Sequence, residues 1–165
     1  EVLPDLTLDQ WTEETVSRIA DQFGVTALYP FQGPPFWPFT QWAIRTANLF
    51  PSPIGLTIHP IFGLWHAFRA ALLFDEDPDF LETKAASPCT SCKTRPCLTA
   101  CPVDAFTIYG YNFDACLGYV AAGENRCRSE GCDARKACPI GQEHRYLPDH
   151  AAFHMRQLLK AHGKA

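Results

Sequence analysis

Cysteine is absent from the first 88 residues of this 165-residue chain and from every position after 138, although the chain contains eight cysteines. A disulfide framework usually spreads its cysteines so that they tie distant segments together. No stretch resembles a secretory signal peptide, with a charged start, an apolar run and a small-residue cleavage site. The confinement of all eight cysteines to one stretch therefore favours a binding site over a fold held by disulfides.

Long hydrophobic runs are also missing. The best candidate, residues 54–74, is interrupted by glycine, histidine, proline and arginine, whereas a transmembrane helix needs about 18 uninterrupted apolar residues. We therefore expect no membrane span and a cytoplasmic protein. The chain begins at Glu1 without an initiator methionine, and we expect it to be a processed or shortened form of a longer one. A hydrophobic content of 47% allows one compact core or two small ones.

A surplus of positive charge is missing as well, since the net charge is −4. Residues 1–88 carry 11 acidic and 4 basic side chains, residues 89–138 carry 5 and 6, and residues 139–165 carry 2 and 4. Nucleic-acid surfaces need a clear excess of lysine and arginine, so the sequence predicts no nucleic-acid binding. The acidic first part would steer a basic partner protein by long-range attraction.

The eight cysteines form two sets, each ending in Cys-Pro. The sets read Cys89-x2-Cys92-x4-Cys97-x3-Cys101-Pro102 and Cys116-x10-Cys127-x4-Cys132-x5-Cys138-Pro139. An iron–sulfur cluster of the four-iron type takes four thiolates, and in the bacterial pattern the cysteine before proline binds the other cluster. Eight cysteines would fill two such clusters and leave none over.

Two other interpretations of the cysteines stay open. Structural zinc is marked by paired Cys-x2-Cys hooks around a tetrahedral ion, but the chain has only one such pair, Cys89 and Cys92. An even number of cysteines is also compatible with disulfides. Neither interpretation explains why both sets end in Cys-Pro.

Local patterns predict the secondary structure around these cysteines. Before the cysteines, we expect a helix over 8–23 with Thr7 and Gln10 as a capping box and Gly24 past its end, then a strand over 25–29 and an irregular aromatic and proline-rich loop over 29–39. A helix from Thr40 to about Phe50, a helix or strand over 65–74, an acidic turn over 75–79 and a linker over 83–88 should follow. Beyond the first cysteine set, we expect a hairpin over 106–113 turning at Gly110, and a tail helix over 150–162. The aromatic loop is either a structural wrap or one wall of a pocket. His59 and His66 lie among apolar residues, where a packing role competes with a role as ligand or acid.

The cysteine motifs over residues 88–142 resemble the two-cluster bacterial-type ferredoxin domain. The resemblance implies crossed ligation of two [4Fe-4S] clusters. The first cluster would bind Cys89, Cys92, Cys97 and Cys138, and the second would bind Cys101, Cys116, Cys127 and Cys132. Two spacings depart from that family, because four residues separate Cys92 from Cys97 and ten separate Cys116 from Cys127.

The long second spacer is similar to the iron–sulfur domain of epoxyqueuosine reductase and of reductive dehalogenases, which join it to a nitroreductase-like, cobalamin-binding domain. Residues 52–69, with Gly63-Leu-Trp65, resemble a strand of those enzymes. The chain as a whole resembles small bacterial ferredoxin-like proteins through its Tyr29-Pro-Phe-Gln-Gly-Pro-Pro loop and its Phe153-His-Met-Arg tail. These resemblances imply an α+β fold with a nitroreductase-like module over residues 1–85, shortened relative to those enzymes, a two-cluster domain over 86–147 and a docking helix over 148–165.

Three functions follow as expectations. The first is electron transfer by two [4Fe-4S] clusters to a redox partner protein, which makes the chain an electron carrier rather than a stand-alone enzyme. The second is a reductase in which the clusters feed a corrinoid or flavin held by the N-terminal module, although the chain contains no glycine-rich phosphate-binding loop. The third is a structural or sensory role for the clusters.

Overall fold

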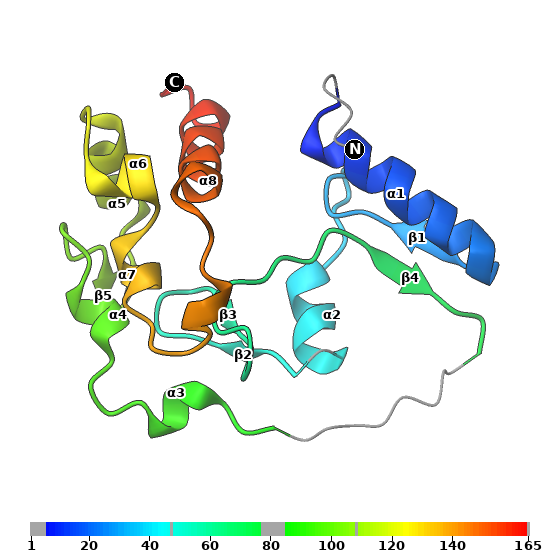
Figure 1. The fold of residues 1–165 in the computed structure, drawn as a ribbon, viewed down its shortest axis with the longest axis horizontal. Coiled ribbons are helices and arrows are strands. Elements are labelled where there is room, and N and C mark those ends of the chain that lie inside the picture. The colour runs from blue at the N-terminus through cyan, green and yellow to red at the C-terminus, as the bar shows by residue number, and fades with distance from the viewer. Residues whose placement is uncertain (1–5, 47, 77–84, 108, 165) are drawn as a thin grey trace. The chain divides into compact units, whose positions relative to one another are not determined.

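The computed structural model describes residues 6–46, 48–76, 85–107 and 109–164. Helices and small antiparallel sheets make the fold α+β (Figure 1). The chain forms two compact units: Glu1–Ala47 with Ala67–Lys84, and Asn48–His66 with Ala85–Ala165. The domain boundary expected near residue 86 lies close to one crossing between these units. The other two crossings fall inside the segment expected to form the N-terminal module.

The first unit begins with the amphipathic helix α1 (Leu8–Phe23), as the sequence predicts. The Thr7 side chain accepts from the Gln10 backbone N–H at 3.2 Å, and the Gln10 side chain accepts from the Thr7 N–H at 2.9 Å. This reciprocal capping box satisfies amide groups that the first helical turn leaves unpaired. Gly24 ends the helix in a left-handed conformation with φ of 63°, which glycine adopts without steric cost.

The first unit also contains a two-stranded antiparallel sheet of β1 (Thr26–Leu28) and β4 (Ala71–Leu73), in which Ala27 pairs with Leu72. The expected element over residues 65–74 is therefore a strand, but only in its last part. Arg69, just before β4, donates to Asp9 and to the Thr12 hydroxyl of α1. These contacts hold the two parts of this unit together.

The aromatic loop returns to α1 through Tyr29, which is buried. Its hydroxyl lies 2.9 Å from the Ser17 hydroxyl and donates to the Glu13 carbonyl at 3.2 Å. Phe36 in the same loop stays 66% exposed. The loop therefore wraps α1 through one ring and leaves others at the surface.

The next helix, α2 (Phe39–Thr46), is shorter than the sequence suggests. Thr40 lies inside the helix rather than at its cap, and the expected extension to Phe50 is wrong. Phe50 instead belongs to β2 (Phe50–Pro51), which pairs with β3 (Thr57–Ile58) in the second unit. Pairing of Phe50 with the buried Ile58 outweighs continuation of the helical pattern.

The second unit contains all eight cysteines, four of them inside helices and four in the caps and turns beside them. In chain order, the elements of this unit after residue 85 are α3 (Pro88–Ser91), α4 (Pro96–Thr99), β5 (Phe106–Thr107), β6 (Gly110–Tyr111), α5 (Phe113–Ala121), α6 (Arg126–Glu130), α7 (Asp133–Lys136), the 3-10 helix η1 (Gln142–His144) and α8 (Pro148–Ala161). The strands β5 and β6 form the predicted hairpin, but Gly110 pairs with Thr107 inside β6 rather than forming the turn. The hairpin is also shorter than predicted, because Asn112 caps α5 and Phe113 begins it. Position 108 lies outside the described residues. The predicted acidic turn and linker also fall partly outside them, at 77–84.

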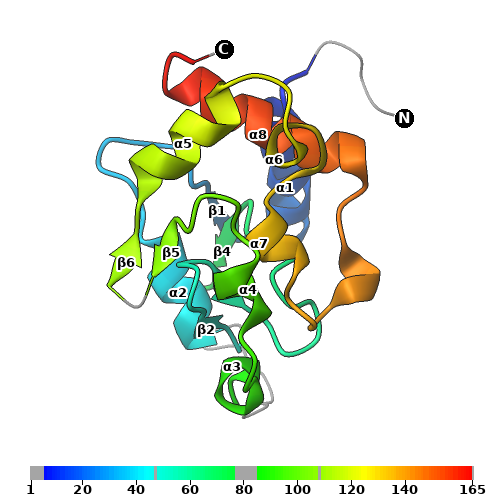
Figure 2. The ribbon, with the colours of Figure 1, turned by 90° about the vertical axis from the view of Figure 1, so that its left-hand side faces the viewer.

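The tail helix α8 packs against α6 and α5 inside the second unit (Figure 2). Leu159 of α8 forms a buried cluster with Val120 and Cys127. The helix approaches closely at Gly131, where an added Cβ would lie 2.8 Å from the Ala151 Cβ. No helix in the described parts of the chain is long and apolar enough to cross a membrane.

Candidate functional site

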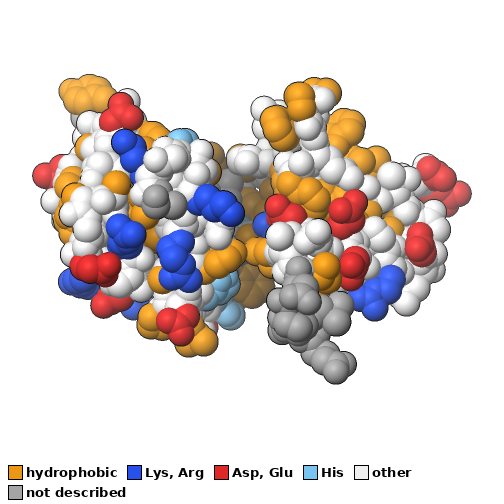
Figure 3. Space-filling model, turned by 90° about the horizontal axis from the view of Figure 1, so that it is seen from above, with side chains coloured by type: hydrophobic (Ala, Val, Ile, Leu, Met, Phe, Trp, Pro, Cys, Tyr) orange, Lys and Arg blue, Asp and Glu red, His pale blue; other side chains and the backbone are white. Residues whose placement is uncertain are grey.

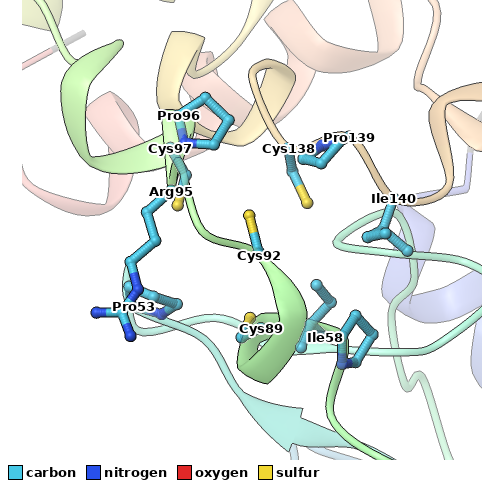
Figure 4. A pocket seen from close by; sticks show the side chains of 11 residues that line it. Pro53, Ile58, Cys89, Cys92, Arg95, Pro96, Cys97, Cys138, Pro139 and Ile140 are labelled. Atoms are coloured by element: carbon cyan, nitrogen blue, oxygen red, sulfur yellow. The ribbon is translucent and has the colours of Figure 1, made fainter.

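Four cysteines line a first cavity in the second unit, with an open space of about 330 Å³. They come from α3, its C-terminal cap, α4 and the turn after α7, and they are Cys89, Cys92, Cys97 and Cys138. Their sulfur atoms point toward one shared space (Figure 4). The other walls are apolar apart from Arg95, and include prolines at 53, 88, 96 and 139. The first cavity therefore gathers one thiol set from both halves of the cysteine stretch.

The other four cysteines line a second cavity in the same unit, with an open space of about 300 Å³. These are Cys101, Cys116, Cys127 and Cys132. The surrounding walls include Phe106, Tyr119, Val120 and Met155. Because Met155 belongs to α8, the tail helix helps to close this site.

The short helices α4 and α7 pack side by side, and each carries the chain from one cavity to the other. Cys97 on α4 faces the first cavity, and Cys101, just past its end, faces the second. Cys132 precedes α7 and faces the second cavity, whereas Cys138 follows it and faces the first. The exchange of the two Cys-Pro cysteines thus follows from two helices that run in opposite directions.

Backbone contact between residues 59–66 and the chain after Cys138 shapes the first cavity. A Cβ on Gly63 would lie 2.0 Å from the Ile140 carbonyl oxygen, and one on Gly141 would lie 2.4 Å from the Phe62 carbonyl carbon. Both glycines have positive φ, 56° and 69°. Ile140 lines the cavity, so this approach of backbone to backbone holds one of its walls in place.

Arg135 of α7 ties the same segment to the cysteines. Its Nε donates to the Leu64 carbonyl at 2.9 Å, and its Nη2 donates to the same oxygen. The guanidinium carbon lies 4.5 Å from the Trp65 ring centroid and 4.6 Å from that of Tyr146. A guanidinium between two aromatic faces is held by cation–π attraction as well as by its hydrogen bonds.

Side chains from η1 and its C-terminal cap secure the turn that presents Cys138. Gln142 donates to the Cys138 carbonyl, and Arg145 donates to the Lys136 carbonyl. These carbonyls lie at the end of α7, where a helix leaves acceptors without partners. The turn is thus fixed by hydrogen bonds at its backbone.

The pKa values of the cysteines reflect burial and the neighbouring thiols. Burial raises the pKa of Cys89 and Cys97, and the neighbouring thiols of Cys138 and Cys92 raise both further. In the second cavity, burial raises the pKa of Cys127 and raises that of Cys132 to about 11. Buried thiols gathered in this way stay protonated at neutral pH unless a cation stabilises the thiolate form.

Backbone N–H groups point at several of these sulfur atoms. The Ala105 N–H donates to the Cys101 sulfur at 3.3 Å. Amides at Arg135 and Ala134 favour the Cys132 thiolate, and the amide at Asp133 favours that of Cys127. Such N–H donors offset part of the cost of burying a thiolate, and around metal clusters they tune the reduction potential.

An ion-pair network borders the second cavity. Asp133, in its wall, lies 2.9 Å from the Lys136 ammonium and 3.5 Å from Arg126. Burial acts to lower the pKa of Lys136, but hydrogen bonds to Asp133 and Glu130 outweigh it, so the net shift is upward. Basic and acidic side chains are interspersed on this unit in Figure 3, in its left-hand part.

The donor sets fit a polynuclear cluster. Each cavity presents four thiols, the ligand number that a [4Fe-4S] cluster requires. Within the described residues, no group of three or more histidine, cysteine, aspartate or glutamate side chains converges closely enough to hold a metal ion. A four-iron cluster binds each thiolate at a separate iron, so its ligands need not converge on one point. All eight cysteines are free thiols.

The structure places the sequence-predicted cysteines in two sets of four, and it places the two histidines elsewhere. His59 Nδ1 accepts the Ile61 and Phe62 backbone N–H groups at 3.0 and 3.2 Å. His66 Nδ1 lies 3.2 Å from the Gly63 carbonyl, which can only accept, and its Nε2 lies 3.1 Å from the Thr57 hydroxyl. Burial lowers the pKa of both histidines. They act as local packing and hydrogen-bonding residues, and neither lines a cysteine cavity.

Sequence reasoning missed several residues that position these sites. Arg135 was not singled out, and Gly63 and Gly141 gave no local signal of their close contact. Tyr111 also went unnoticed, although its hydroxyl is hydrogen-bonded to the Cys116 side chain. Burial raises the pKa of this phenol, and the bond to Cys116 raises it further. Arg135, Gly63 and Gly141 contact segments far away in the sequence, whereas Tyr111 and Cys116 are near neighbours whose contact depends on the turn between β6 and α5.

Comparison with known proteins adds no further assignment. No protein-family model matches the chain, and searches of curated proteins and of solved structures find no match either.

Proposed function

We propose that this chain is an electron-transfer protein that holds two [4Fe-4S] clusters and exchanges electrons with redox partner proteins. The first cluster is bound by Cys89, Cys92, Cys97 and Cys138, and the second by Cys101, Cys116, Cys127 and Cys132. The observation that carries the proposal is the sorting of eight cysteines into two cavities with four thiols each. The sorting is crossed, as in the two-cluster ferredoxin domain that the sequence resembles.

The protein environment suits this role. The clusters supply sites that accept and release single electrons. Apolar walls and backbone N–H donors around the thiols set the electrostatic environment in which those electrons are held. The α4 and α7 helices keep the thiol sets close together, which suits exchange between two centres. The chain thus provides a relay rather than a substrate-converting site.

Access from solvent differs between the two cavities. Cys89, Cys92 and Cys97 are only partly buried, and the exposed residues Lys93 and Arg95 lie in the spacer between Cys92 and Cys97. Within the described residues neither of these bases forms an ion pair. The first site is therefore the better exchange point for a partner protein, and its basic spacer suits an acidic partner surface.

The test is anaerobic purification followed by iron and sulfide analysis and a redox titration monitored by electron paramagnetic resonance. Two clusters predict about eight iron and about eight sulfide per chain, with reduced-state signals from both centres. Zinc without sulfide would contradict the proposal. Corrinoid or flavin absorption bands in addition to the clusters would favour a reductase. Filled clusters that take up no electrons at any accessible potential would favour a structural role.

A further inference from the structure

A pair of histidines on the tail helix lies apart from both cysteine sets. His150 and His154 are one turn apart on α8, so both rings project from the same face of the helix. Their Nε2 atoms lie 3.0 Å from each other. Neither residue lines the first or the second cysteine cavity.

Aromatic contacts fix the orientation of both rings. Tyr146 stacks on His150 with centroids 4.0 Å apart and an interplanar angle of 19°. Its ring also stacks on His154 at 5.4 Å and 30°. Tyr146 is held in turn by the guanidinium of Arg135, 4.6 Å from its centroid. The imidazoles are therefore positioned by packing, which lowers the entropy lost when they bind a ligand together.

The geometry of the two nitrogen atoms matches that of a chelating pair. Metal–nitrogen bonds from histidine are about 2.0–2.1 Å long, so two such bonds to one ion bring their nitrogen atoms to roughly 3 Å from each other. Without an ion, a single proton can lie between two neutral rings, and two protonated rings at this distance repel. Histidines at i and i+4 on one helix face form the same chelate in helical zinc motifs.

We propose that His150 and His154 form a two-imidazole site for a divalent transition-metal ion such as Ni²⁺, Zn²⁺ or Cu²⁺. Imidazole suits these ions. Water or a partner molecule completes the coordination, because no group of three potential ligands converges in the described residues. Asp149 in the first turn of α8 offsets the positive end of the helix, which would otherwise oppose a cation there. The site does not depend on what the cysteines bind.

The test is an anaerobic titration of the untagged, cluster-loaded chain with Ni²⁺, in which isothermal calorimetry measures the binding. One saturable ion per chain is expected. His150→Ala and His154→Ala should each weaken binding by at least about tenfold, since a chelate becomes a single ligand. Iron content before and after titration shows whether Ni²⁺ has displaced cluster iron. An unchanged visible spectrum shows that each variant keeps its fold.

The matched control is His162→Ala, because His162 is exposed at the C-terminal cap of the same helix and contacts Phe113 instead. It should bind Ni²⁺ as tightly as the unmodified chain. Three results would overturn the proposal. These are the absence of saturable binding, binding that survives both substitutions in the pair, and an equal loss in His162→Ala.

Discussion

The two cysteine cavities contain the same four donors but have different walls. Prolines and one arginine surround the first, and three of its cysteines are partly exposed. Two buried cysteines, Tyr119, Val120 and the tail-helix residue Met155 enclose the second. Burial and hydrogen bonds to sulfur set the potential of a cluster as much as the ligands do. Because the two cavities have the same ligands but different walls, we expect the two proposed clusters to have unequal reduction potentials.

The two cavities also differ in how distant chain segments close them. The first depends on contact of backbone with backbone between Gly63 and Ile140. The second lies beside a contact of backbone with side chain between Gly131 and Ala151. A substitution at one contact should therefore affect one site and spare the other.

Gly63→Ala should have the largest effect. The added Cβ would lie 2.0 Å from the Ile140 carbonyl oxygen, at a φ of 56°. Left-handed strain and overpacking together cost about 3 kcal/mol or more. We expect loss of the first cluster with retention of the second, measured as a fall in iron from about eight to about four per chain.

Two companion variants test whether that loss is local. Gly131→Ala should impair the second site instead, because its Cβ would meet Ala151 at 2.8 Å. Gly118→Ala on α5 meets no atom within 4 Å and should stabilise the chain slightly, by about 0.5–1 kcal/mol. If Gly63→Ala and Gly131→Ala reduce the same electron paramagnetic resonance signal, the two closures are not independent.

Arg135→Ala should have the next largest effect and should weaken both sites. Arg135 lies on α7 between Cys132 and Cys138, and its loss removes the hydrogen bonds to Leu64 and two cation–π contacts. Together these interactions contribute about 3 kcal/mol. The measurement is the midpoint of thermal loss of the visible cluster absorption. Arg156→Ala, at an exposed position on α8, is the control, and an equal shift there would show that charge alone is responsible.

Tyr111→Phe should sharpen the comparison by changing only the second site. Removing the hydroxyl deletes its hydrogen bond to Cys116. That hydrogen bond stabilises the reduced cluster, which carries more negative charge. Loss of about 0.5–1.4 kcal/mol corresponds to a potential roughly 20–60 mV more negative. Tyr109→Phe, on the same hairpin but 94% exposed, should leave both potentials unchanged. A shift in the first centre would contradict the assignment of Tyr111 to the second.

Arg69→Ala should have the smallest effect and should leave both clusters filled. Its ion pair with Asp9 lies within the first unit, and the two side chains are 36% and 52% exposed. Solvent screening limits the loss to below about 1 kcal/mol. Tryptophan fluorescence during thermal unfolding measures the change, and iron analysis serves as the control. Loss of iron in this variant would show that the cysteine sites depend on the first unit.

The sequence predicted the local features of the fold well. Thr7 and Gln10 cap α1 as expected, and the expected hairpin forms, although Gly110 lies in its second strand rather than at its turn. These features depend on neighbours a few residues apart, so local patterns contain the information. The end of α2 and the short extent of β4 depend on pairing with distant strands, which periodicity does not encode.

The candidate site divides in the same way. The family resemblance implied which cysteines belong together, and the structure gathers those sets around its two cavities. The residues that hold the sets in place, Gly63, Gly141 and Arg135, act across some 70 residues of sequence. No local pattern predicts such contacts. The inclusion of residues 48–66 in the cysteine-bearing unit has the same origin.

Iron analysis of two double variants tests the crossed arrangement most directly. Both variants lack Cys89, which belongs to the first cavity. In Cys89→Ser/Cys138→Ser both losses fall in the first cavity, so about four iron should remain per chain. In Cys89→Ser/Cys101→Ser each cavity loses one ligand, so both clusters should be lost. The reverse result, with about four iron in the second variant and almost none in the first, would show that each cluster takes its ligands from consecutive cysteines and would contradict the account.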